Sequence, residues 1–225
     1  MDERIRPSGP SPETTSEVTA EIGGKGKRTR ERLMDAAYEA ILTKGFSGTS
    51  IDELVEAAGI KKGGFFYHFR DKGDLARHLL NRFLEEDETV MDELTARAHA
   101  SSDDPMQRFL AFLDLYAEAM DQMEELHPGC LVAAILYQEQ AFDRDVRQVL
   151  FDTAMRWRAR FRQWFLEIET KYRALTPVEL DTIADSFSAV VEGSIVLTRA
   201  LNDHRLLGRQ LRLFRDMVKT VYAVR

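Results

Sequence analysis

The sequence has few of the features that mark secreted or membrane proteins. It contains one cysteine, Cys130, among 225 residues, which excludes an internal disulfide and fits a reducing compartment. No apolar run approaches the roughly 20 residues needed to span a bilayer, and the N-terminal segment lacks the apolar core of a secretory signal. We therefore predict a soluble, cytoplasmic protein without a membrane partner.

Motifs for catalysis and for cofactor binding are also missing from the sequence. The five histidines lack the spacing of metal ligands. The chain has neither a phosphate-binding glycine loop nor a nucleophile elbow. We therefore predict no metal, no cofactor and no enzymatic activity.

Charge is distributed unevenly along a chain whose formal net charge is −7. Residues 24–82 carry twelve basic and eight acidic side chains, whereas residues 83–225 carry seventeen basic and twenty-five acidic ones. A basic unit joined to an acidic body suggests two separate tasks. The first residues are rich in Pro, Ser, Thr, Gly and Glu and bury too little apolar surface to offset the entropy of ordering. We predict a disordered tail over residues 1–24.

Hydrophobic periodicity predicts helices through the rest of the chain. Ser50 and Glu53 form a capping box at the start of a short helix, and Asp104 before Pro105 marks another helix start. No segment has a convincing strand pattern. We predict an all-α fold of roughly eight to ten helices, over residues 28–44, 51–58, 61–69, 72–100, 105–123, 131–139, 143–171, 177–201 and 205–224.

Two of these helices are short and are separated only by Gly59 and Ile60. With the longer helix before them, they have the order of a helix-turn-helix unit, in which the second short helix enters the DNA major groove. Gly63 and Gly64 remove side chains near the start of that helix and allow a close approach to DNA. The spacing of the rings predicts that Phe65 and Phe69 pack inward, while Phe66, Tyr67 and His68 face DNA.

Residues 29–75 resemble the DNA-binding domain of the TetR family of transcriptional regulators. The resemblance lies in Gly45-Phe46 at a helix end, Thr49 before the capped helix, the Ala58-Gly59-Ile60 turn, the Lys62-Gly63 pair and Lys72-x-x-Leu75. It implies a DNA-binding domain over residues 25–72 and a helical ligand-binding and dimerisation domain over residues 73–225. The predicted DNA-binding residues are Arg28, Thr49, Lys61, Lys62, Gly63, Gly64, Phe66, Tyr67, His68 and Lys72.

Three positions of the second short helix depart from the family pattern. Lys61 replaces a small capping hydroxyl, so the helix start lacks a side-chain cap. Gly64 and Phe66 replace residues that would supply a base contact and a phosphate contact.

The resemblance also implies a homodimer that binds a palindromic double-stranded DNA operator. In this family the last two helices of each subunit form the interface, and small residues in the first of them allow close helix approach. An alternative is that these stripes fill the core of the monomer. The predicted interface residues are Ile183, Phe187, Val190, Val191, Ser194, Ile195, Leu207, Phe214, Met217, Val218 and Val221.

A further implication is a small-molecule effector that binds in the body and changes the spacing of the two recognition helices. Aromatic and methionine side chains suit an adaptable apolar pocket, although the same side chains also suit a plain hydrophobic core. The predicted pocket residues are Phe109, Leu113, Tyr116, Met120, Cys130, Leu131, Ile135, Tyr137, Trp157, Phe161 and Trp164.

We interpret the chain as a ligand-responsive DNA-binding transcriptional regulator. The favoured interpretation is a repressor that a small molecule releases from its operator. One alternative is a repressor switched by oxidation of Cys130, because a position at a helix start lowers a thiol pKa. The alternative for Cys130 is a purely structural role, as a small buried residue. A third hypothesis, from another class, is an all-α enzyme or lipid carrier without specific DNA binding.

Overall fold

The computed structural model describes residues 12–138 and 144–224. Within these ranges the chain forms nine helices and one pair of short strands, so the prediction of an all-α fold is confirmed. The elements are α1 (Pro12–Lys44), α2 (Ile51–Ala57), α3 (Lys62–His68), α4 (Lys72–Ser101), α5 (Pro105–Asp121), α6 (Leu131–Leu136), α7 (Arg144–Glu169), β1 (Tyr172–Ala174), α8 (Leu180–Leu201), α9 (Leu206–Val221) and β2 (Tyr222–Val224). None of the helices described is both long and apolar enough to cross a membrane.

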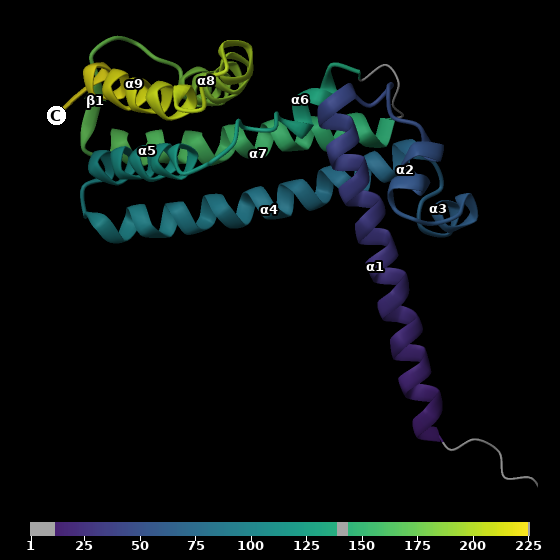
Figure 1. Ribbon diagram of the computed structural model, residues 1–225. Helices are drawn as coiled ribbons and strands as arrows, with labels where there is room; N and C mark the ends of the chain where they lie inside the picture. The colour runs from purple at the N-terminus through teal and green to yellow at the C-terminus, as the bar shows by residue number, and fades with distance from the viewer. Residues whose placement is uncertain (1–11, 139–143, 225) are drawn as a thin grey trace, which may run out of the picture.

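Two hydrophobic cores lie along the long helix α4. This helix runs from the end of the molecule that carries α2 and α3 to the opposite end (Figure 1). The first core joins α1, α2 and α3 to the start of α4, and α6 and the start of α7 complete it, with Leu33, Leu54 and Phe65 at its centre. The second core joins the end of α4 to α5, α7, α8 and α9 around Phe109 and Phe187. Because α4 contributes to both cores, the core of the N-terminal unit extends beyond the boundary predicted at residue 72.

The predicted start signals of α2 and α5 are confirmed, and α4 begins with a cap of the same kind. Ser50 and Glu53 exchange hydrogen bonds in a complete capping box at the start of α2. The carboxylates of Asp71 and Asp104 accept backbone N–H groups at the starts of α4 and α5. These contacts satisfy donors that a helix leaves free in its first turn.

The turn that separates α2 from α3 depends on glycine. Gly59 has a φ of 63°, a left-handed conformation that costs a side-chain-bearing residue free energy. The N-cap of α3 is Lys61, which makes no side-chain capping hydrogen bond, as predicted. The sequence between residues 51 and 69 therefore specifies two helices and the turn between them.

The helix α1 is longer than the sequence predicts. It begins at Pro12 rather than at residue 28 and projects well away from the rest of the molecule (Figure 1). The helix thus includes residues 12–24, which the sequence predicts as part of a disordered tail, and residues 1–11 lie outside the described residues. A proline at the first helical position has no N–H to leave unpaired, which makes residue 12 a favourable helix start.

Two predictions about the C-terminal part are also wrong. The helix α8 begins at Leu180, not at residue 177, and its N-cap Glu179 makes no capping hydrogen bond. The strands β1 and β2 form an antiparallel pair in which Tyr172 lies opposite Val224. Each strand has three residues, which is too short for an alternating pattern to be recognised.

Candidate DNA-binding surface and effector region

The inner face of α3 holds the helix in the N-terminal core. Phe65 and Phe69 are fully buried there and their ring centroids lie 5.7 Å apart. Both were predicted to pack inward, and the prediction is confirmed. The guanidinium of Arg30 on α1 lies 5.3 Å from the ring centroid of Phe69, so α1 and α3 meet at this ring.

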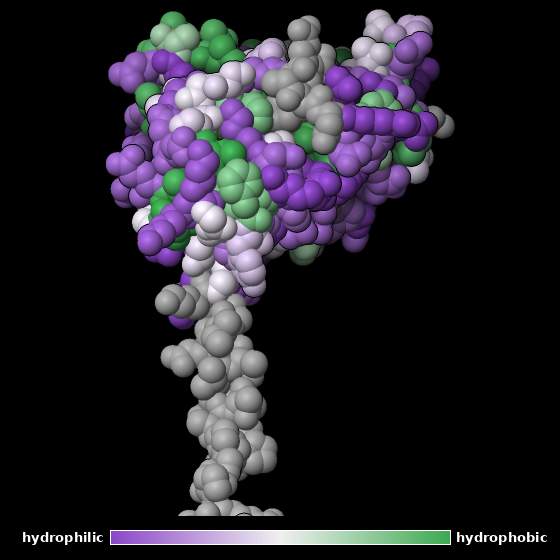
Figure 2. Space-filling model, turned by 90° about the vertical axis from the view of Figure 1, so that its right-hand side faces the viewer, coloured by the Kyte–Doolittle hydropathy of each residue, from purple (hydrophilic) through white to green (hydrophobic). Residues whose placement is uncertain are grey.

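The outer face of α3 is open to solvent. Tyr67 is 82% exposed and Phe66 is 52% exposed, and Lys61 and Lys62 are exposed as well. The ammonium of Lys62 lies 2.8 Å from the carboxylate of Asp52, but both side chains are well exposed and the pair adds little stability. Figure 2 views the molecule from the end that carries α3 and shows a mainly hydrophilic surface with scattered apolar groups.

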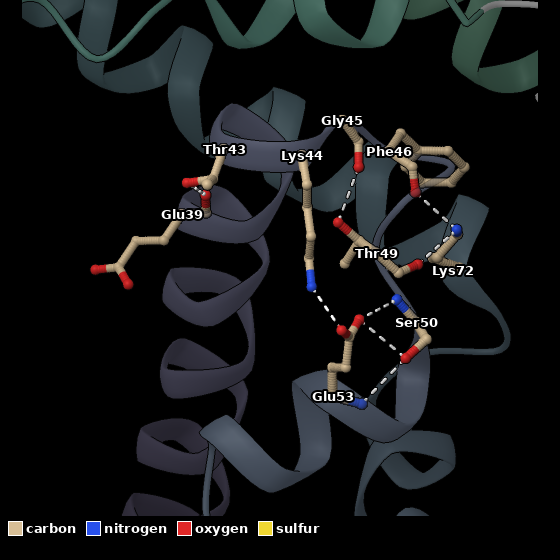
Figure 3. A network of polar contacts seen from close by, with 9 residues as sticks. All are labelled: Glu39, Thr43, Lys44, Gly45, Phe46, Thr49, Ser50, Glu53 and Lys72. Carbon is tan, nitrogen blue, oxygen red and sulfur yellow. Dashed lines mark hydrogen bonds and ion pairs between the residues drawn. The ribbon is translucent and has the colours of Figure 1, made fainter.

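A polar network fixes the loop between α1 and α2 (Figure 3). Thr49 is only 2% exposed, and its hydroxyl donates to the carbonyl of Gly45 at 2.9 Å. The ammonium of Lys72 donates to the carbonyls of Phe46 and Thr49, each at 2.8 Å, and lies 4.2 Å from the Phe46 ring centroid. Burial lowers the pKa of Lys72. Thr49 and Lys72, both predicted to bind DNA, thus hold the loop, and Lys72 keeps one N–H for another acceptor.

The remaining predicted contacts differ in accessibility. Gly63 has open space where a side chain would begin, whereas a Cβ on Gly64 would lie 3.3 Å from Ile60. Gly64 therefore allows close packing against the turn as well as an approach to DNA. His68 is half-buried, and burial together with Arg30 lowers its pKa. Arg28 is exposed on α1.

The predicted effector pocket is distributed over several places. Six of its residues are fully packed in the two cores, and Tyr137 is 79% exposed and faces solvent. A cavity of about 560 Å³ opens instead between α4 and α7, and of the predicted residues only Trp157 and Trp164 line it. The packed residues are Phe109, Leu113, Leu131, Ile135, Phe161 and Trp164.

The polar lining of this cavity was missed from the sequence. Its α4 side includes Asp87, Glu88 and His99, and its α7 side includes Arg156 and Arg160. A signal for it exists, because the acidic residues Glu88 and Asp92, four apart on α4, match the basic residues Arg156 and Arg160, four apart on α7. That signal becomes visible only when the two helices are known to be neighbours.

The environment of Cys130 differs from the one expected for a reactive thiol. Cys130 is the N-cap of α6, and its sulfur accepts the backbone N–H of Ala133 at 3.5 Å. The pKa of the thiol is raised to about 12, mainly by burial and in part by the nearby carboxylate of Glu192. These effects outweigh the helix start, so the prediction of a lowered pKa is wrong and the thiol-switch alternative has no support.

The predicted dimer stripe lies mostly inside the subunit. Seven of its residues are buried in the monomer, and Met217 is the one that is exposed, at 52%. Val190, Val191 and Val221 are partly covered. The buried seven are Ile183, Phe187, Ser194, Ile195, Leu207, Phe214 and Val218.

A three-helix unit with an exposed short helix, joined through α4 to a helical body, defines a helix-turn-helix DNA-binding protein. Residues 33–79 match the family model described as "Bacterial regulatory proteins, tetR family". A TetR transcriptional regulator from Chloroflexus aurantiacus has the same fold, with a TM-score of 0.71 and 23% identity over 89% of this chain and 99% of that chain.

Two relatives match most of the chain. It is 27% identical over 167 residues to the transcriptional regulator AcuR of Cereibacter sphaeroides, which is 74% of each chain. It is 22% identical over 167 residues to the HTH-type transcriptional repressor DhaR of a Mycobacterium species, covering 74% of this chain and 80% of that one. The DNA-binding unit of the chain therefore matches the TetR family of bacterial regulatory proteins over residues 33–79.

Proposed function

We propose that the protein is a transcriptional repressor that binds an operator as a homodimer and leaves it when a small molecule binds the helical body. Similarity to DhaR, which is named a repressor, supports the direction of regulation. The observation that carries the proposal is the division of α3 into a buried face and an exposed face. Phe65 and Phe69 fix the helix, and Lys61, Lys62 and Tyr67 remain available for DNA.

The dimer that we propose uses the outer faces of α8 and α9. Val196 and Leu197 on α8 and Leu213 and Met217 on α9 are large apolar side chains exposed on the subunit. Gly193, one turn before Val196, has open space where a side chain would begin, which leaves room for a partner helix. An exposed apolar face of this kind on a water-soluble domain marks an interaction surface.

Contacts between the body and the DNA-binding unit give the effector a route to the DNA. The helix α6 packs against α1 and α4 in the first core. The side chain of Gln138, just after α6, accepts the backbone N–H of Ser47 at 2.6 Å. A shift of α6 would therefore move the loop before α2. To release DNA, the effector must bind the released state more tightly than the bound state.

The test is selection of binding sites from a random double-stranded DNA library, followed by titration of the selected site by fluorescence anisotropy. The proposal predicts a site with two symmetric half-sites and an affinity that falls steeply with salt. A matched variant carries Lys61→Gln and Lys62→Gln and should select no site. Equal enrichment by the wild-type protein and this variant would contradict the proposal.

A further inference from the structure

The cavity between α4 and α7 is an aromatic groove. Trp157 and Trp164 are seven residues apart on α7, so they lie on one face of the helix about 10 Å from each other. Thr95 and His99 face them from α4, and the ring of His99 lies 4.8 Å from that of Trp164. The volume of about 560 Å³ falls in the range of small-molecule sites.

The two guanidinium groups in the groove are already neutralised across it. Arg156 lies 2.9 Å from the carboxylate of Glu88, and Arg160 lies 2.7 Å from that of Asp92. These pairs join α7 to α4. Their charges cancel, so neither arginine gives the groove a net positive charge that would attract an anion.

Two further carboxylates in the lining, those of Asp87 and Glu167, form no ion pair with a lysine or arginine in the described part of the chain. Asp87 accepts a hydrogen bond from the indole N–H of Trp157 at 3.1 Å. Glu167 accepts one from the amide of Gln163 at 3.0 Å, and its nearest basic group is the imidazole of His99 at 3.9 Å. Burial raises the pKa of Asp87, while the Trp157 indole and the charge of Arg160 offset part of the rise.

One hydroxyl in the lining also lacks a partner. The Thr95 side-chain oxygen is buried and makes no hydrogen bond within the described residues. A buried hydroxyl without a partner costs free energy that a bound molecule can recover. The groove thus combines two indole side chains, of which Trp164 is nearly buried, with an excess of negative charge and a free hydrogen-bonding group.

We propose that this groove binds an organic cation with an aromatic or apolar body, and that the cation is the effector of the regulator proposed above. Indole faces attract cations, and they do so more strongly where water is excluded. The carboxylates of Asp87 and Glu167 supply the counter-charge, and Thr95 supplies a hydrogen bond. The effector role rests on the proposed function, whereas binding of the cation does not.

The position of the groove supplies the coupling to DNA. Trp157 packs against the first core and Trp164 belongs to the second. The helix α4, which forms the opposite wall, leads directly into the DNA-binding unit. A molecule that parts the two ion pairs between α4 and α7 therefore changes how the two cores sit along α4.

The test uses intrinsic fluorescence, because the chain has two tryptophans and both line the groove. Tetraphenylphosphonium is the cationic probe, and tetraphenylborate has the same shape with the opposite charge. The cation should quench the emission, excited at 295 nm, in a saturable way and bind at least about tenfold more tightly than the anion.

The matched variants are Asp87→Asn and Glu93→Gln. Asp87→Asn keeps an acceptor for the Trp157 indole but removes the charge, so the affinity for the cation should fall about tenfold. The second makes the same charge change at an exposed position of α4 outside the groove, and should have no effect. Equal affinities of the two variants, tighter binding of tetraphenylborate, or no saturable signal would each overturn the site.

Operator binding separates this proposal from the previous one. Tetraphenylphosphonium should weaken operator binding by the wild-type protein and have a smaller effect on Asp87→Asn. Specific operator binding without any tryptophan response would contradict the proposed cation site but not the proposed regulator function. A charge-selective tryptophan response without any specific DNA binding would support the cation site and contradict the regulator.

Discussion

At the scale of single residues, α3 separates the side chains that fold the protein from those that can read DNA. Phe65 is fully buried, whereas Tyr67, two residues later, is almost fully exposed. The ring of Tyr67 contacts that of His68 on the same helix, with centroids 4.9 Å apart. Little of the protein's core therefore depends on Tyr67, while its hydroxyl and ring are placed for a phosphate or a base edge.

Replacement of Tyr67 by alanine tests this separation. We expect Tyr67→Ala to weaken operator binding by about 1–3 kcal/mol and to leave the thermal midpoint of the free protein nearly unchanged. The control is Phe65→Ala, which should cost about 3–5 kcal/mol of stability because it opens a cavity in the core. Anisotropy and thermal unfolding provide the two measurements. If Tyr67→Ala lowers the thermal midpoint nearly as much as Phe65→Ala does, Tyr67 stabilises the folded core and the separation is wrong.

Cys130 provides a second test at this scale, because it is the one cysteine of the chain. With its pKa raised to about 12, only a minute fraction is thiolate at neutral pH. Since the thiolate is the reactive form, we expect iodoacetamide to label the native protein on the order of 10³-fold more slowly than an unfolded control. The rate should rise with pH up to the stability limit of the fold. Labelling at the rate of the unfolded protein would restore the thiol switch as a hypothesis.

At the scale of elements, the sequence predicts helices well where local signals determine them. The capping box at Ser50 and the turn at Gly59 were identified from adjacent residues, because each acts over a few positions. The start of α8 and the pair of strands were missed, since neither has a local signal of that strength. The stripe from Ile183 to Ile195 was identified as apolar, but periodicity does not tell which neighbour an apolar stripe faces.

The cavity shows the same limit more clearly. Its walls come from α4 and α7, and residues such as Glu88 and Arg156 are 68 positions apart in the chain. Their opposite charges are visible in the sequence, but their proximity is a property of the packing. The aromatic residues of α5 and α7 were predicted as pocket walls, and most of them fill the second core instead.

The extension of α1 is the element whose role most needs a test. Lys25, Lys27 and Arg28 lie in the part of α1 that precedes the first core. We expect deletion of residues 1–28 to lower operator affinity and to flatten the plot of log affinity against log salt by about 0.9 for each phosphate that the protein no longer neutralises. A full-length variant with these three residues changed to glutamine should flatten the slope similarly. An unchanged slope in both proteins would show that the extension binds no phosphate.

At the scale of the whole molecule, the two cores and α4 explain how one chain can hold a DNA-binding unit and a regulated body. Residues 24–82, which include the DNA-binding unit, carry the basic excess, and residues 83–225, which form most of the helical body, carry the acidic excess. This separation directs DNA to one end of the subunit. A palindromic site needs two such ends at a fixed spacing, which only a defined dimer supplies.

The outer faces of α8 and α9 are the surface from which we expect that dimer to form. Leu197→Glu and Met217→Glu each place a charge on this face without entering the core, since both side chains are exposed in the subunit. Each should raise the dimer dissociation constant, as measured by sedimentation equilibrium, and weaken operator binding because the two half-sites are no longer bound together. The matched control is Leu175→Glu, an equally exposed leucine after β1, which should remain dimeric. If Leu197→Glu and Met217→Glu form dimers as stable as the wild type, the interface must lie on another face of the subunit. A monomeric wild-type protein would contradict the proposal that the regulator acts as a dimer.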